Sequence, residues 1–294
     1  MSSPNNALNF GDCIGCGLCV LGCPAYEETG FDVLTARGRN RALQAGLAAG
    51  DMRESIWACT LCGYCDAICP TGVHNVEIVL HLRRELHGES RAPSPESRAP
   101  SESLVLGCTI RDRAPHLIPS IHEFLRRIKR PIDGQAGASA CCGSLDVEAG
   151  RGVRVRSNAG VVADPICLEQ YDADFLGVLA MQHLALFDLR PPFYYFAPHR
   201  LVNRDHARVY PLYDALRRRY ECEMNLDLNR LARSTSAGSL QGLSGDHARD
   251  IPAAVARLLA HSRAERIITC SPADYLAFKA YSGRETLFIT ECLR

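Results

Sequence analysis

Hydrophobic and polar positions divide the chain into two parts with different patterns. In the first part, Thr35 to Ala49 is rich in Ala, Leu, Arg and Gln, and Val73 to His87 repeats apolar residues at helical spacing. Both segments are predicted to be helices, with Gly50 ending the first. The second helix is expected to turn one apolar face inward and a polar face outward, the latter carrying Arg83, Arg84 and Glu85.

In the second part, short apolar runs alternate with amphipathic segments. The apolar runs predict strands at Leu104–Leu106, Val178–Met181, Phe193–Phe196, Arg266–Thr269 and Leu287–Ile289. The amphipathic segments predict helices at Ile118–Arg130, Val209–Tyr220 and Pro272–Ala280. This alternation favours an α/β layer structure for the second part and an α+β class for the whole chain.

A segment rich in Pro, Ser and charge separates the two parts. The sequence from Ser90 to Glu96 is almost repeated from Ser97 to Ser103. Such a composition cannot bury a core, so we expect residues 89–103 to form a flexible linker between residues 1–88 and 104–294.

Composition narrows the class of protein. The chain has 294 residues, 47% of them hydrophobic, and a formal net charge of zero. The balanced charge argues against a general nucleic-acid binder. No apolar run approaches the roughly 20 residues of a membrane helix, and the N-terminal sequence does not look like an export segment. We therefore expect a cytoplasmic protein, and leave open a peripheral position at the inner face of the membrane through a partner.

Eight of the fifteen cysteines form two runs with the same spacing, C-x-x-C-x-x-C-x-x-x-C-P. This spacing is typical of two [4Fe-4S] clusters, in which three cysteines of one run and the fourth of the other bind each cluster. Zinc sites do not need the repeated fourth Cys-Pro, and a disulfide framework would require an oxidising compartment. The predicted ligands are Cys13, Cys16, Cys19 and Cys69 for cluster 1, and Cys59, Cys62, Cys65 and Cys23 for cluster 2.

Glycines between the ligands are expected to allow close approach of the backbone to the clusters. Gly15, Gly17 and Gly63 have no Cβ, so backbone N–H groups can reach the cluster sulfurs there. Such N–H dipoles offset thiolate charge and help to set the reduction potential.

A second group of cysteines follows the linker, at Cys108, Cys141, Cys142 and Cys167. Adjacent cysteines rarely form a disulfide with each other, but two adjacent thiolates can bind different irons of one cluster. Asp164 stands three positions before Cys167 in a turn of the form C-P-x-C, where it replaces the first cysteine and can bind iron through oxygen. The group is a candidate third centre; the alternative is a set of buried, inert cysteines.

These motifs resemble the CCG-domain iron–sulfur proteins, which include subunits of heterodisulfide reductases, glycolate oxidase and anaerobic glycerol-3-phosphate dehydrogenase. The resemblance rests on both cysteine runs, on Ala36–Arg39 (similar to P-R-G-R), and on Gly107–Cys108, Ala140–Gly143 and Asp164–Cys167. It implies a helical two-cluster ferredoxin domain at 1–88, followed by two related CCG modules at 104–190 and 191–294.

The second module departs further from the family pattern. His199 follows Ala197-Pro198 where the family has a cysteine, and Ser234–Gly238 stands where a CCG sequence would fall. Ser271 and Asp274 occupy the positions of the last two cysteines, and Cys270 is expected to pack in the core. Hard or inert groups have replaced soft thiolates, so we expect the fold to be kept and the cluster lost. The alternative is that His199 and Asp274 bind another ligand.

The leading functional hypothesis is an electron-transfer subunit of an oxidoreductase complex. The chain has no G-x-G-x-x-G or P-loop sequence, so a flavoprotein, a membrane quinone-reactive subunit, or both are expected as partners. The acceptor is a disulfide, a quinone or another protein. The alternatives are a catalytic heterodisulfide or thiol reductase acting at the third centre, and a redox-sensing or assembly protein.

Overall fold

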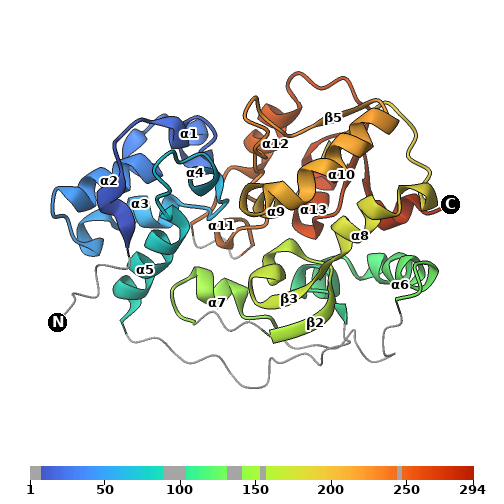
Figure 1. Ribbon diagram of the computed structural model, residues 1–294, viewed down its shortest axis with the longest axis horizontal. Helices are drawn as coiled ribbons and strands as arrows, with labels where there is room; N and C mark the ends of the chain where they lie inside the picture. Colours follow the sequence, from blue (N-terminus) through green and yellow to red (C-terminus); the bar gives the residue numbers. More distant parts are fainter. Residues whose placement is uncertain (1–7, 89–103, 131–140, 153–156, 244–246) are drawn as a thin grey trace.

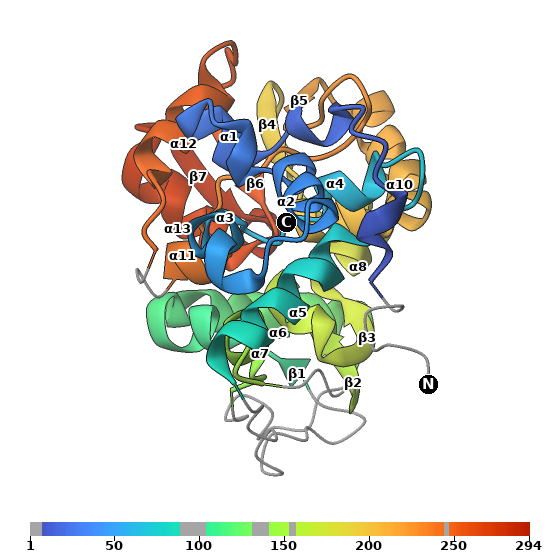
Figure 2. The same cartoon turned by 90° about the vertical axis from the view of Figure 1, so that its left-hand side faces the viewer.

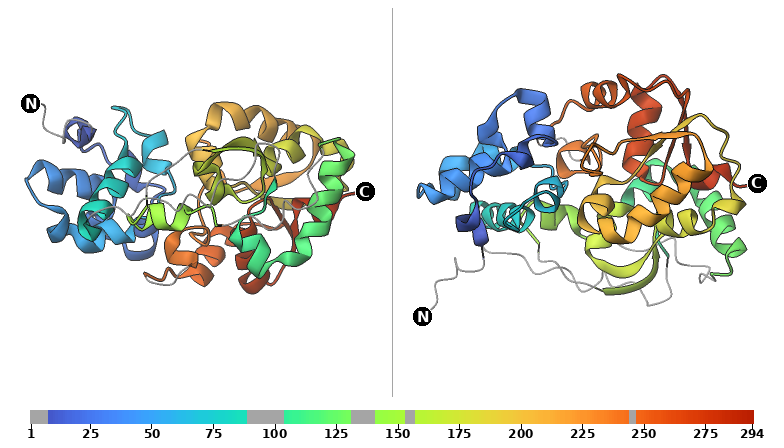
Figure 3. Two further views of the ribbon diagram at one scale, coloured as in Figure 1. Left: turned by 90° about the horizontal axis from the view of Figure 1, so that it is seen from below. Right: turned by 45° about the horizontal axis from the view of Figure 1, so that its top comes forward.

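The computed structural model describes residues 8–88, 104–130, 141–152, 157–243 and 247–294, so the expected linker lies outside it. A helical first part lies beside two parallel sheets (Figure 1), which confirms the predicted α+β class. Figure 3 shows the same arrangement from two further directions. None of the described helices has the length and apolar character needed to cross a bilayer.

The first part is a set of short helices packed around an apolar core. Thr35 caps the predicted first helix by accepting a hydrogen bond from the Gly38 N–H at 3.2 Å. The helix ends at Gln44, so the prediction that it continues to Gly50 is wrong, and Gly50 lies in a separate helical turn. The Asn40 side chain donates to Asn75 at 2.8 Å and joins two of the helices in the interior. The helices are Pro24–Thr29 (α1), Ala36–Gln44 (α2), Arg53–Ala58 (α3), Tyr64–Ala67 (α4) and Asn75–His87 (α5).

The first sheet belongs to residues 104–190 and has the strand order β1-β2-β3, with all pairs parallel. Its middle strand, β2, contains six residues, and short helices connect and cover the strands. The strands are Leu104–Val105 (β1), Ser157–Val162 (β2) and Tyr171–Phe175 (β3), and the helices are Ile118–Arg127 (α6), Ser144–Glu148 (α7) and Leu176–Gln182 (α8).

The second sheet has the order β5-β4-β6-β7, again with parallel pairs only. Its strands are Phe193–Phe196 (β4), Cys222–Met224 (β5), Arg266–Thr269 (β6) and Glu285–Phe288 (β7). The helices around it are His199–Arg204 (α9), His206–Arg219 (α10), Leu240–Leu243 (α11), Ile251–Leu259 (α12) and Pro272–Tyr281 (α13).

The two sheets repeat one arrangement. In β1-β2-β3 and in β4-β6-β7, the middle strand is joined in parallel to an earlier and a later strand. The Asp164 turn follows the middle strand of the first sheet, and the Ser271 turn follows that of the second. Ligand sites in parallel sheets lie beyond the carboxyl ends of the strands, and both turns stand at such ends. The topology therefore supports two related halves.

Two further predictions from the apolar pattern are wrong. Val178–Met181 is part of the helix α8, and the strand precedes it at Tyr171–Phe175. An apolar run that is buried on all sides has no period that separates helix from strand. The strand at Tyr171–Phe175 contains two aspartates, so its residues do not form the apolar run from which a strand is predicted.

Arg83 is the second correction. The helical pattern predicts it on an outward polar face, but its side chain is fully buried. Its Nη1 donates to the Glu148 carbonyl of α7 at 2.7 Å and its Nη2 to the Cys59 carbonyl at 2.5 Å. The supposedly outer face of α5 is covered by α7 of the other part, as Figure 2 shows from the side of the helical part.

This contact gives a test of the packing between the two parts. A Cβ on Gly150 would lie 2.5 Å from the backbone of Arg83, whereas a Cβ on Gly46 meets nothing within 4 Å. Both glycines have positive φ, so the conformational cost of introducing alanine is similar in the two variants and cancels in the comparison. We expect Gly150→Ala to destabilise the holoprotein by roughly 1–3 kcal/mol more than Gly46→Ala, measured by denaturant unfolding. Equal losses would show that α5 and α7 do not pack as described.

Candidate metal centre

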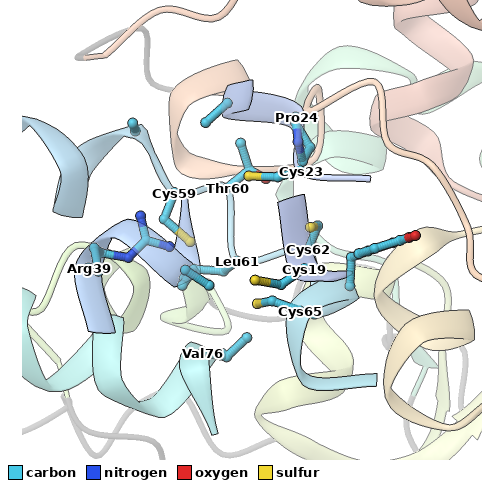
Figure 4. A pocket seen from close by; sticks show the side chains of 15 residues that line it. Cys19, Cys23, Pro24, Arg39, Cys59, Thr60, Leu61, Cys62, Cys65 and Val76 are labelled. Atoms are coloured by element: carbon cyan, nitrogen blue, oxygen red, sulfur yellow. The ribbon is translucent and has the colours of Figure 1, made fainter. Parts of the chain in front are cut away.

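The cysteines of the first part gather around two neighbouring cavities. The inner cavity holds about 370 Å³ of empty space and is lined by Cys19, Cys23, Cys59, Cys62 and Cys65. Their sulfur atoms lie around the same space in Figure 4, with Arg39 and Val76 at its edge. The outer cavity holds about 340 Å³ and is lined by Cys13, Cys16, Cys19 and Cys69.

Each cavity combines cysteines from both runs. Cys69 of the second run joins the outer cavity, and Cys23 of the first run joins the inner one. Cys19 lines both cavities and stands between them. This grouping supports the predicted exchange of the fourth ligand, although the ligand assignment itself stays a prediction. At least four thiol groups line each cavity, as a [4Fe-4S] cluster requires.

The loops curve around these cavities because glycine permits left-handed backbone. Gly15, Gly17 and Gly63 have φ values of 73°, 85° and 78°, which a residue with a Cβ adopts only under strain. Gly17 and Gly63 each come immediately before a helical turn, at Leu18 and at Tyr64. The backbone conformation of the loops therefore requires these glycines, and the contact of their N–H groups with cluster sulfurs stays a prediction.

The two cavities differ in their exposure and in the acidity of their thiols. Cys16 of the outer cavity is exposed, and Cys62 of the inner cavity is buried. Burial raises the pKa of the Cys62 thiol to about 12 and that of Cys65 well above its ordinary value. At Cys69, burial also raises the pKa, but hydrogen bonds from Thr71 and from the Val73 N–H outweigh it and lower the pKa. The inner thiols therefore need a bound metal to become thiolates at neutral pH.

The structure also brings together the second group of cysteines. The sulfurs of Cys142 and Cys167 are 3.1 Å apart, and the Gly143 N–H donates to the Cys141 sulfur at 3.5 Å. Cys108 lies next to Cys141, and their hydrogen bond raises the pKa of Cys108 and lowers that of Cys141. The four sulfurs thus share one site beyond the carboxyl ends of β1 and β2.

Asp164 belongs to the same neighbourhood and is buried. Its Oδ1 accepts from the Ile166 N–H at 3.2 Å, and a Cβ on Gly107 would lie 2.6 Å from its own Cβ. Burial raises the pKa of its carboxyl to about 6. Across the described ranges, no three His, Cys, Asp or Glu residues lie close enough to bind a single metal ion. The site does not have the geometry of a mononuclear zinc centre.

In the second module, the corresponding site is a cavity whose lining contains no thiol. His199, Ser271 and Asp274 line a cavity of about 240 Å³ that also includes Asp164 and Arg200. Burial lowers the pKa of His199 to about 3, so its imidazole is neutral, and burial raises the pKa of Asp274. Cys270 packs in the core, where its sulfur lies 3.3 Å from the Tyr195 hydroxyl. This set of side chains does not fit an iron–sulfur cluster.

Several functional residues escaped the sequence analysis. Arg200 is buried and pairs with Glu148 and Glu169, so that an ion cluster joins the two modules. Asn203, Arg204 and Gln241 donate to the carbonyls of the loop that carries Cys59 and Cys62. These residues belong to no motif, and only their long-range contacts distinguish them from other polar helix residues.

Comparison with known proteins bears on the helical part. Residues 9–73 match the family model of the 4Fe-4S dicluster domain. This domain therefore binds two [4Fe-4S] clusters, as the cysteine spacing predicted. No solved structure matches the chain.

Several curated relatives are named as iron–sulfur or reductase subunits. One subunit of the ferredoxin/F420H2-dependent CoB-CoM heterodisulfide reductase of Methanosarcina acetivorans is 35% identical over 34% of this chain and 60% of its own length. A probable glycolate oxidase iron-sulfur subunit of Bacillus subtilis is 34% identical over 26% of this chain and 18% of its own. A fumarate reductase iron-sulfur subunit of Escherichia coli is 31% identical over 22% and 30%. These relatives confirm the resemblance to heterodisulfide-reductase-related iron–sulfur proteins, and the chain spans less than two thirds of each.

The exchange of ligands between the runs can be tested by removing one exchanged cysteine at a time. We expect Cys69→Ala to lose the cluster of the outer cavity and Cys23→Ala to lose the cluster of the inner cavity. Each variant is expected to keep about four of the eight irons. Iron analysis and EPR of the reduced protein measure this, with Cys222→Ala as the control that keeps all the iron. Loss of the same cluster in both variants would contradict the assignment.

Proposed function

We propose that this chain is the iron–sulfur electron-transfer subunit of an oxidoreductase complex. The observation that carries the proposal is the pair of adjoining cysteine cavities, the outer one lined by the exposed Cys16 and the inner one by the buried Cys62, with Cys19 in the lining of both. A [4Fe-4S] cluster supplies one-electron transfer when it is bound. We infer that electrons pass between the two sites in series.

The chain's own residues give the two sites different tasks. At the outer cavity, the exposed Cys16 and the exposed side chains of Ile14 and Leu18 present the site to a partner. At the inner cavity, the buried Arg39 places a positive charge at the lining, which offsets the charge that thiolates acquire on metal binding. A surface site and a shielded site are what a conduit between two partners requires.

The expected partners are a flavoprotein dehydrogenase, a membrane quinone-reactive subunit, or both. The relatives are named as subunits of heterodisulfide reductase, glycolate oxidase and fumarate reductase, and this supports a place in such a complex. A cytoplasmic position, with attachment to the membrane only through a partner, follows from the same proposal.

One observation favours a second candidate function, catalysis at the first CCG module. Cys108, Cys141, Cys142 and Cys167 surround one site, with the Cys142 and Cys167 sulfurs in contact. We propose these four cysteines, with Asp164, as the ligands of a third iron–sulfur or other metal centre. In the conduit hypothesis this centre passes electrons onward; in the catalytic hypothesis it reduces a disulfide or thiol-linked substrate.

Composition of the anaerobically purified protein tests the conduit hypothesis. We expect about eight irons and as much sulfide from the helical domain, more if the third centre is filled, and an EPR signal of interacting clusters on reduction. Zinc without sulfide would contradict the proposal.

Substitution at the third centre separates the two hypotheses. The double variant Cys141→Ser, Cys142→Ser is expected to keep both cubane EPR signals under either hypothesis. Turnover of the partner complex that survives in this variant would rule out catalysis at the CCG centre and leave the two cubanes as the conduit, whereas a catalytic CCG centre requires turnover to be abolished. Cys222→Ser serves as the control for loss of a cysteine from the same half.

A further inference from the structure

The loop that carries Cys59 and Cys62 is held from outside by the second module. The Cys62 carbonyl accepts from Asn203 Nδ2 at 3.1 Å, and the Leu61 carbonyl accepts from Arg204 Nη2 at 3.2 Å. The Cys59 carbonyl accepts from Gln241 Nε2 at 2.9 Å. These donors belong to α9 and α11, more than a hundred residues along the chain. We call Asn203, Arg204 and Gln241 the clamp.

Further polar contacts within the α/β half hold Asn203 and Arg204 of the clamp in place, and Gln241 is held by burial. Asn203 and Gln241 are each 2% exposed. Asn203 also accepts from the Ala232 N–H at 2.8 Å and donates to the Ala232 carbonyl at 3.1 Å. Arg204 pairs with the buried Glu169. A buried amide with both ends occupied cannot turn away without leaving a polar group unpaired, which costs about 1–3 kcal/mol.

Holding these carbonyls outward fixes the direction of the N–H groups on the other side. In a planar trans peptide the C=O and N–H point in opposite directions. The carbonyls of Cys59, Leu61 and Cys62 therefore turn the N–H groups of the following residues away from the clamp. Those residues, Thr60, Cys62 and Gly63, line the inner cavity. Within the described chain, no backbone carbonyl accepts from these three N–H groups.

The outer cavity has a counterpart that comes from its own domain. Gln44 Nε2 lies within 3.2 Å of the carbonyls of Phe10, Gly11 and Cys13. Gln44 belongs to α2 of the helical part. The inner loop is thus held by the α/β half together with Arg83 of α5, whereas the outer loop is held by the helical domain itself.

We propose that the second module, whose own cluster ligands have been replaced, sets the reduction potential of the inner cluster through the clamp. Reduction adds one electron and one negative charge, and N–H groups aimed at the sulfurs stabilise that charge. The clamp keeps three N–H groups aimed inward and so raises the potential of the inner cluster. The proposal rests on the two-cluster function proposed above, with the inner cavity as the site of cluster 2.

An EPR-monitored redox titration of the full-length protein with both clusters tests the proposal. Asn203→Leu and Gln241→Met remove clamp donors while keeping similar volume. Asn203→Leu is expected to shift the inner couple to a more negative potential. Gln241→Met is expected to shift it in the same direction by less, because Arg83 still donates to the Cys59 carbonyl. Both variants are expected to leave the outer couple unchanged. Gln44→Met is expected to shift the outer couple to a more negative potential and to leave the inner couple unchanged. Asp214→Asn, which removes an exposed ion pair with Arg230 in the same module, is the control with both couples unchanged.

The outcomes separate this proposal from the one it rests on. A native protein without two cluster couples would overturn the proposed function. A native protein with two couples that both stay in place in Asn203→Leu and Gln241→Met would overturn the clamp alone, as would equal shifts of both couples. If Asn203→Leu loses the inner cluster, Gln241→Met decides, because the Cys59 carbonyl keeps Arg83 as a second donor.

Discussion

A cubane cluster needs four thiolates, and one short cysteine loop supplies three of them. The fourth must come from elsewhere, so two loops far apart in the sequence have to meet. The packing of the helices in the first part brings the two loops together. The Asn40–Asn75 hydrogen bond ties α2 to α5 beside the outer cavity, and Pro24 starts a helix immediately after Cys23 at the inner one. Cys23 and Cys69 thereby each stand with the other run.

The same packing connects the helical part to the α/β half. Arg83 lies between the Cys59 carbonyl and the Glu148 carbonyl, and Glu148 pairs with Arg200 of the second module. The charges at this junction are buried, yet each has a partner of opposite sign or a carbonyl, which buried charges require. The ion cluster occupies the junction where the carboxyl ends of both sheets face each other. In this half a polar junction joins residues 104–190 to residues 191–294 and to the inner loop.

The cluster loops and some of the strands could be predicted from the sequence, because their signals lie within short segments. The cysteine runs, the glycines between them and the strands Phe193–Phe196 and Arg266–Thr269 carry their information within a few residues, and the structure agrees with each strand. The strand at Tyr171–Phe175 and the burial of Arg83 depend on what packs against them, which no local pattern records. The clamp is the clearest case, because Asn203 and Gln241 become significant only through carbonyls in another domain.

The central claim is that two clusters occupy adjoining cavities and exchange one ligand each. Diffraction from anaerobically grown crystals at the iron absorption edge locates the irons directly. The account predicts two separate iron positions, an outer one beside Cys13, Cys16 and Cys69 and an inner one beside Cys23, Cys59 and Cys62. A single iron position, or two positions each surrounded by the four cysteines of one run, would contradict it.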